Sequence, residues 1–122
     1  MPKTEVIFFQ DTDGSVPVID WLDEQLTKVQ DKLVVRVERL EKMGHELRRP
    51  EAAHLRDGIY ELRAKHLRVN YRVLYFFHEQ KAVLSNGLTK EAAVPDSDIN
   101  IAIGNMKKYV ADPKQHTHVD EE

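Results

Sequence analysis

Three basic residues follow a pattern that suits the binding of a phosphodiester. Arg63 and Arg72 fall on neighbouring strand-like runs, and Lys90 follows the next such run. Because side chains alternate along a strand, Arg63 points away from Leu62, and Arg72 points away from Val73. Guanidinium groups bind phosphate through paired hydrogen bonds, and an ammonium group adds a compact charge. Three such cations on one open sheet face could stabilise the extra negative charge of the transition state in phosphodiester cleavage.

A structural alternative remains for the two arginines. Arg63 could pair with Glu61 or Glu79, and Arg72 could simply be solvated. The charge pattern leaves both interpretations open. The chain of 122 residues has a net charge of -3, but residues 45–90 carry +4, whereas residues 1–44 carry -3 and residues 91–122 carry -4. A basic centre between acidic ends favours either a local anionic partner or charges that solvate strands and a loop.

Other catalytic signatures are absent from the sequence. It contains no cysteine, which excludes thiolate zinc sites and cysteine nucleophiles. It also lacks the G-x-S-x-G, P-loop and H-E-x-x-H motifs. His116 and His118 have the spacing of a metal-ligand pair, but we expect them to belong to a disordered end. We therefore predict no metal and no cofactor.

The hydrophobic periodicity predicts an α+β fold of a single domain. The predicted elements are a strand over residues 4–9, a helix beginning near residue 16, a helix over 31–43, strands over 59–65, 69–78 and 81–89, and a helix beginning near 96. The two helices that follow the first strand would form a hairpin. The short connection at 79–80 predicts an antiparallel pair of strands. We expect residues 1–110 to form the domain and residues 111–122 to form a flexible acidic tail.

The ends of these elements carry recognisable signals. Ser15 is the expected N-cap of the first helix, and a bend is expected over residues 27–30 before the second helix. Gly44 is the expected C-terminal stop. Residues 45–57 are expected to form a polar loop, and Asp96 or Ser97 is the expected cap of the last helix.

The apolar residues also indicate where the chain resides. The longest apolar run is residues 73–77, much shorter than the roughly 18 residues of a membrane-spanning helix. We therefore expect a cytoplasmic protein without membrane association. The strand over 69–78 is one-sided at its start and apolar on both faces near Leu74 and Phe76. Either the C-terminal segment or a partner should cover that end.

Two segments resemble a known family. Residues 49–63, RPEAAHLRDGIYELR, resemble a signature of RelE/HigB-like toxins of the phage-derived branch, in which a proline, a leucine, a glycine and Glu-Leu-Arg follow the helical hairpin. Residues 70–77, NYRVLYFF, resemble the Tyr-Arg-apolar-apolar-Tyr strand of that family. The order of elements also matches, so the resemblance covers residues 4–110.

The resemblance implies a fold and a function. It implies a RelE-like domain and the toxin half of a type II toxin–antitoxin module. Many such toxins are ribosome-dependent endoribonucleases that need no metal: the 2′-hydroxyl of mRNA attacks the adjacent phosphate and leaves a 2′,3′-cyclic phosphate. The usual partner in this branch is a small helix-turn-helix antitoxin.

The resemblance also assigns roles to residues of this chain. Arg63, Arg72 and Lys90 become candidates for phosphate binding and transition-state stabilisation, and Tyr75 becomes a candidate general base. The candidate RNA-binding residues are Arg49, Arg56, Lys65, Arg68 and His78. Lys90 stands where the family commonly has two lysines, but here its neighbours are Thr89 and Glu91.

The general base and the activity itself remain open. A tyrosine must lower its pKa from about 10 to act as a base near neutral pH, whereas His66 and His78 titrate in the right range. Tyr75 could instead be a core residue. The isoelectric point of about 6.1 is low for an RNA-cleaving toxin. The alternatives are a non-catalytic inhibitor of the gyrase-directed type and a degenerate toxin that only binds its antitoxin.

Overall fold

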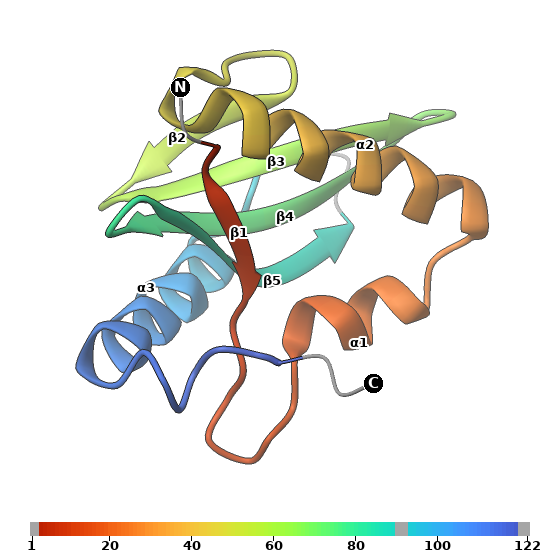
Figure 1. Ribbon diagram of the computed structural model, residues 1–122. Helices are drawn as coiled ribbons and strands as arrows, with labels where there is room; N and C mark the ends of the chain where they lie inside the picture. Colours follow the sequence, from red (N-terminus) through yellow and green to blue (C-terminus); the bar gives the residue numbers. More distant parts are fainter. Residues whose placement is uncertain (1–2, 90–92, 120–122) are drawn as a thin grey trace.

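The computed structural model describes residues 3–89 and 93–119. The elements are β1 (Glu5–Phe8), α1 (Pro17–Asp23), α2 (Thr27–Met43), the 3-10 helix η1 (Gly44–Glu46), β2 (Ala52–Arg56), β3 (Ile59–His66), β4 (Val69–His78), β5 (Lys81–Thr89) and α3 (Asp96–Ala111). This arrangement confirms the predicted α+β fold, with an N-terminal strand, two helices, a mainly antiparallel sheet and a C-terminal helix (Figure 1).

The strands of the described residues form one sheet in the order β1-β5-β4-β3-β2. β2, β3, β4 and β5 are antiparallel neighbours, whereas β1 lies parallel to β5. The predicted antiparallel pairing of residues 69–78 with residues 81–89 is confirmed. Its turn residues Glu79 and Gln80 have φ angles of 49° and 67°, which match the right-handed twist of the two strands.

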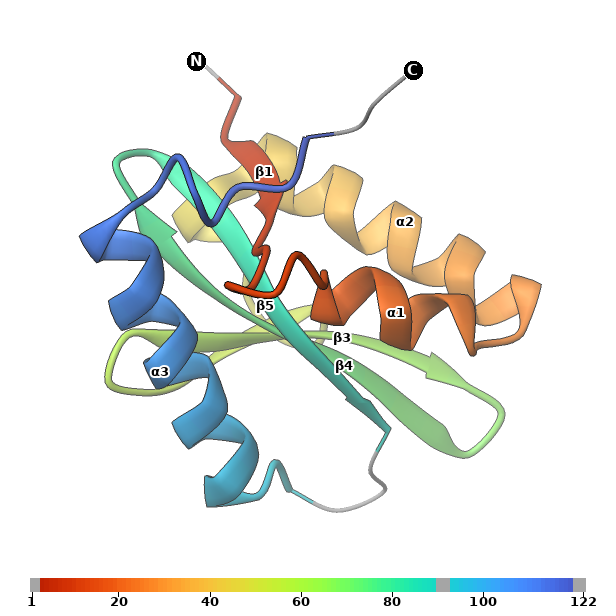
Figure 2. The same cartoon turned by 90° about the horizontal axis from the view of Figure 1, so that it is seen from below.

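Two apolar layers cover the two faces of the sheet (Figures 1 and 2). On one face α1 and α2 pack on Leu62, Val73 and Tyr75. On the other face α3 packs on Leu74 and Phe76. The predicted cover for the end of β4 that is apolar on both faces is therefore the C-terminal helix.

Close packing of α1 on β5 depends on a glycine. A Cβ atom at Gly87 would lie 2.2 Å from Cε3 of Trp21, closer than real Cβ contacts. The absence of a side chain at Gly87 therefore lets the indole ring lie directly on the strand.

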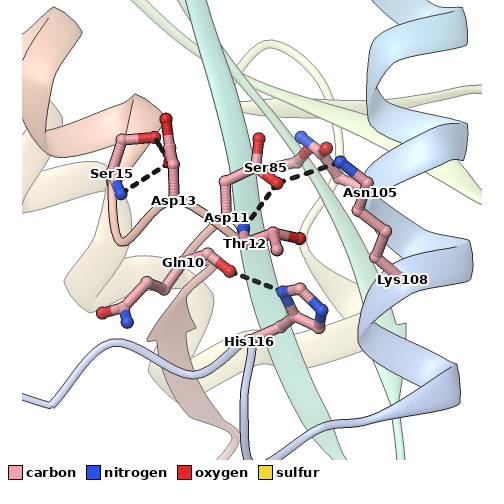
Figure 3. Close-up of polar contacts among 9 residues, drawn as sticks. All are labelled: Gln10, Asp11, Thr12, Asp13, Ser15, Ser85, Asn105, Lys108 and His116. Atoms are coloured by element: carbon pink, nitrogen blue, oxygen red, sulfur yellow. Dashed lines mark hydrogen bonds and ion pairs between the residues drawn. The ribbon is translucent and has the colours of Figure 1, made fainter.

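The start of α1 differs from the prediction. Val16, not Ser15, is the N-cap, and its side chain makes no capping hydrogen bond. Ser15 instead donates hydrogen bonds from its backbone N–H and its hydroxyl group to Oδ1 of Asp13, at 2.9 and 2.6 Å (Figure 3). The side chain of Ser15 is therefore used in the preceding turn.

Further boundaries move for tertiary reasons. α2 begins at Thr27, where a bend was expected, and Nε2 of Gln30 donates to the carbonyl oxygen of Leu22 at 2.9 Å. Gly44 does end the helix, with a φ angle of 52°. The N-cap of α3 is Pro95, one residue before the expected caps.

Residues 52–56, expected to lie in a loop, form β2. Ala52 pairs with Leu62, and His54 pairs with Tyr60. The segment has few β-branched or aromatic residues, so hydrogen bonds to β3 rather than intrinsic preference hold it in the sheet.

The C-terminal segment packs against β1, which corrects the prediction of a flexible tail for residues 112–119. His116 is buried and stacks on Phe9 with ring centroids 5.3 Å apart. Nδ1 of His116 lies 2.7 Å from the carbonyl oxygen of Gln10, as Figure 3 shows. The backbone N–H of His118 donates to the carbonyl oxygen of Phe8 at 2.9 Å. These contacts protect the outer edge of β1.

Polar contacts also attach α3 to the rest of the molecule (Figure 3). Nδ2 of Asn105 donates to the buried hydroxyl group of Ser85, at a bulge in β5. Nζ of Lys108 lies 2.9 Å from Oδ1 of Asp11 and holds the pKa of that carboxyl group below its usual value. α3 is therefore held at the sheet and at the loop after β1.

Candidate functional site

The two predicted catalytic arginines lie side by side on adjacent strands. Arg63 of β3 is directly opposite Arg72 of β4 in the antiparallel register. Their neighbours Leu62 and Val73 point into the core beneath α2, so both arginines lie on the opposite face of the sheet. The predicted convergence of Arg63 and Arg72 is therefore observed, whereas Lys90 lies outside the described residues.

A carboxylate lies between the two arginines. Oε1 of Glu61 is 3.8 Å from Nε of Arg63, and Oε2 of Glu61 is 3.3 Å from Nε of Arg72. Glu61 and Arg72 are both buried, whereas the side chain of Arg63 is 26% exposed. The alternative pairing of Arg63 with Glu61 is thus confirmed, and the expectation that Arg72 is solvated is wrong. The trio carries a net charge of +1 when all three groups are ionised.

Polar residues continue the same sheet face beyond the arginines. Lys65 and Asn70 form the next pair on this face in the β3–β4 register. Residues Arg63, Lys65, Asn70 and Arg72 are called the cationic face below. Arg63, Lys65 and Asn70 line a hollow of about 440 Å³ together with Arg36 and Pro50. No carboxylate of the described residues lines this hollow, so it suits an anionic group.

The site also includes basic residues that the sequence analysis missed. Nε of Arg36, on α2, donates to the carbonyl oxygen of Arg63 at 2.9 Å. Arg39 binds both carboxylate oxygens of Glu51, with distances of 3.1 and 3.3 Å. Lys32, Arg36 and Arg39 are spaced by four and three residues and therefore share one side of the helix. This helical spacing in the sequence could have identified these three residues as one basic surface.

Tyr75 is not part of this site, which corrects its assignment as a candidate base. Its side chain is 1% exposed and belongs to the core between the sheet and α2, on the face opposite Arg72. Burial raises the pKa of Tyr75 far above its ordinary value of about 10, and Tyr60 adds to this shift. A base near neutral pH would need the opposite shift.

Replacing Tyr75 by phenylalanine should therefore leave any catalytic activity of the cationic face within about twofold of the unmodified chain. The raised pKa keeps folded Tyr75 protonated, whereas the unfolded chain loses this proton above about pH 10. The resulting contribution to stability is present below pH 10 and is lost at higher pH, by up to about 1.4 kcal/mol per pH unit. Urea unfolding at pH 7 and pH 11 should show a smaller alkaline loss in Tyr75→Phe. An equal loss in both proteins would contradict this assignment.

The other histidines considered as bases lie elsewhere. His78 is six residues from Arg72, about 20 Å along the strand, where its ring contacts Tyr109 edge-on. His66 alternates with Arg63 and Lys65 along β3 and so lies on the other face.

The remaining predicted RNA-binding residues are dispersed. Arg49 and Arg68 are exposed in turns. Arg56 is bound to Asp57 at 2.8 Å and to Asn100 of α3 at 2.9 Å. Of the five predicted RNA-binding residues, only Lys65 belongs to the cationic face.

Among the described residues no group of three or more histidines and carboxylates could hold a metal ion. In the same part of the chain, no helix has the length and apolar character needed to cross a membrane.

The sequence of this chain matches a known protein family. Residues 20–107 match the family described as "Phage derived protein Gp49-like (DUF891)". The chain belongs to this Gp49-like family. The family is toxin-like, and the match includes the second half of α1, all of α2, the cationic face of the sheet and most of α3. A search of curated proteins gives no match to this Gp49-like protein.

Proposed function

We propose that this Gp49-like protein is the toxin of a type II toxin–antitoxin module, acting as a metal-independent endoribonuclease on ribosome-bound mRNA in the cytoplasm. The observation that carries the proposal is the pair of arginines on one sheet face, bridged by Glu61 and bordered by a hollow whose described lining residues are basic or uncharged. A helix-turn-helix antitoxin of the RelE/HigB-like type is the proposed protein partner.

In this mechanism the 2′-hydroxyl oxygen bonds to the adjacent phosphorus atom as the bond from phosphorus to the 5′-oxygen breaks. Arg63 binds the non-bridging oxygens, whose negative charge grows in the transition state. Glu61 lies within ion-pair distance of both arginines, so it fixes their guanidinium groups and can accept the proton of the 2′-hydroxyl group. The departing 5′-oxygen takes up a proton from water, and Glu61 returns its proton to water, so the products are a 2′,3′-cyclic phosphate and a 5′-hydroxyl group.

A direct test incubates the purified chain with an end-labelled mRNA, with and without translating ribosomes. We expect ribosome-dependent cuts that leave a 2′,3′-cyclic phosphate and are unchanged by a chelator. A single 2′-deoxy substitution at the cleaved linkage is the matched control and should stop cleavage there. Cleavage that survives this substitution, or that requires a divalent cation, would overturn the mechanism.

The second candidate is a non-catalytic member of the same family. It is favoured by the burial of Arg72, which has 5% of its surface exposed, and by the carboxylate of Glu61 beside it. In that case the trio would be a structural ion network. Growth arrest upon induced expression without any RNA cleavage would select this alternative.

A further inference from the structure

β3 is longer than β2, so the last residues of β3 extend beyond Ala52, the first residue of β2. The last backbone hydrogen bond between them joins the N–H of Arg63 to the carbonyl oxygen of Glu51, at 2.8 Å. From there on, α2 side chains cover the edge. Arg36 donates to the carbonyl oxygen of Arg63, and Nζ of Lys32 donates to the carbonyl oxygen of Lys65 at 3.0 Å. These contacts block the addition of another strand.

The helix and the strand have matching repeats here. Four helical residues rise about 6 Å, and two strand residues rise between about 6 and 7 Å. Lys32 and Arg36 therefore meet alternate carbonyl groups of the same strand. The result is a row of cations along the edge, formed by Lys32, Arg36 and Lys65, which we call the cationic edge.

Each of these groups keeps hydrogen-bond donors for a ligand. Capping a carbonyl group uses Nε of Arg36, so its two terminal nitrogens remain, with Nη1 3.7 Å from Glu51. Glu51 is bound more closely by Arg39. A second hollow, of about 250 Å³, lies along the edge and shares Arg36 and Lys65 with the hollow of the cationic face. In the part of the chain that the structure describes, no acidic residue lines either hollow.

We propose that the cationic edge binds a second phosphate of single-stranded RNA, next to the linkage held at Arg63. This inference rests on the proposed function, because it takes RNA as the ligand of the cationic face. The RNA strand would leave that face across the free edge of β3 and continue along α2. A polar row at regular spacing fits a repeating anionic backbone better than it fits the mixed surface of a folded protein.

The test measures binding of a non-cleavable 2′-O-methyl RNA of ten nucleotides by fluorescence anisotropy at several salt concentrations. The variant Lys32→Gln/Arg36→Gln removes two charges but retains amide donors that can cap the carbonyl groups. We expect about tenfold weaker binding and a salt slope smaller by about 0.7, which corresponds to one phosphate contact. The control Lys107→Gln/Lys114→Gln removes two exposed charges from α3 and the segment after it, and should change neither quantity.

RNAs of two lengths distinguish a failure of this inference from a failure of the proposed function. A dinucleoside monophosphate, followed by NMR shifts, should bind Lys32→Gln as it binds the unmodified chain, because Lys32 does not line the hollow of the cationic face, but should lose affinity in Arg63→Gln. Unchanged decamer binding by the edge variant, with loss in Arg63→Gln, would overturn the cationic edge and leave the proposed function intact. No RNA binding by the unmodified chain would overturn both. If Lys32→Gln/Arg36→Gln binds polyglutamate more weakly than the unmodified chain does but binds RNA equally well, the edge is a site for an acidic protein segment instead.

Discussion

Replacing Arg63 or Arg72 by glutamine should slow RNA cleavage by a factor of about 10² to 10³, the usual effect of removing one fixed donor to transition-state charge. Glutamine keeps a polar side chain, but it is shorter than arginine and lacks the charge and the forked donor geometry. The measurement is the single-turnover rate of cleavage on translating ribosomes. Because the two residues are cross-strand neighbours bridged by Glu61, the double variant should lose little more than either single variant.

The control for this result is Lys107→Gln, which removes an exposed charge from α3 and should cleave at the normal rate. Thermal unfolding must accompany each rate, since Arg72 is buried and its loss also weakens the fold. If Arg63→Gln retains full activity while folding normally, Arg63 does not contact the reacting phosphate. The non-catalytic alternative then becomes the better account.

Replacing Glu61 by leucine should lower the free energy of unfolding by about 3 kcal/mol. Glu61 is buried beside buried Arg72 and half-buried Arg63, so its removal leaves two guanidinium groups facing each other without their carboxylate. A loss of this size should reduce the melting temperature by about 10 °C for a chain of this length. Urea unfolding at pH 7 measures the change directly.

A double-mutant cycle identifies the cause of that loss. The variant Glu61→Leu/Arg72→Leu removes both buried charges and should be more stable than Glu61→Leu alone, because only the partly exposed Arg63 then lacks its carboxylate partner. If the double variant is less stable by the sum of the two single losses, the residues act independently. The role of Glu61 in fixing Arg72 would then be wrong.

The local sequence was sufficient for the strands that build the site. Alternation in β3 and β4 predicted the side of each strand on which Arg63 and Arg72 lie, because a strand repeats every two residues whatever surrounds it. The same alternation groups Tyr75 with Val73, and the core position of Tyr75 follows from it. The family motif suggested a catalytic role that the strand geometry does not support.

Elements that depend on distant partners could not be predicted in this way. β2 is rich in alanine, and only its pairing with β3 makes it a strand. The segment after α3 is polar, yet His116 is buried against Phe9, which lies more than 100 residues earlier. Likewise, the spacing of Lys32 and Arg36 gave a helical stripe, but not the free edge of β3 on which that stripe lies.

The parallel pairing of β1 with β5 has a consequence for the timing of synthesis. Residues 5–8 pair with residues 81–84, so the first strand has no partner until most of the chain has left the ribosome. Non-local pairings of this kind form late in folding. The β3–β4 hairpin that carries both arginines can form earlier, but the sheet is complete only after β5 and α3 have been made. On the proposed function, a growing chain therefore lacks the assembled face for RNA until β5 has been made and has paired with β4.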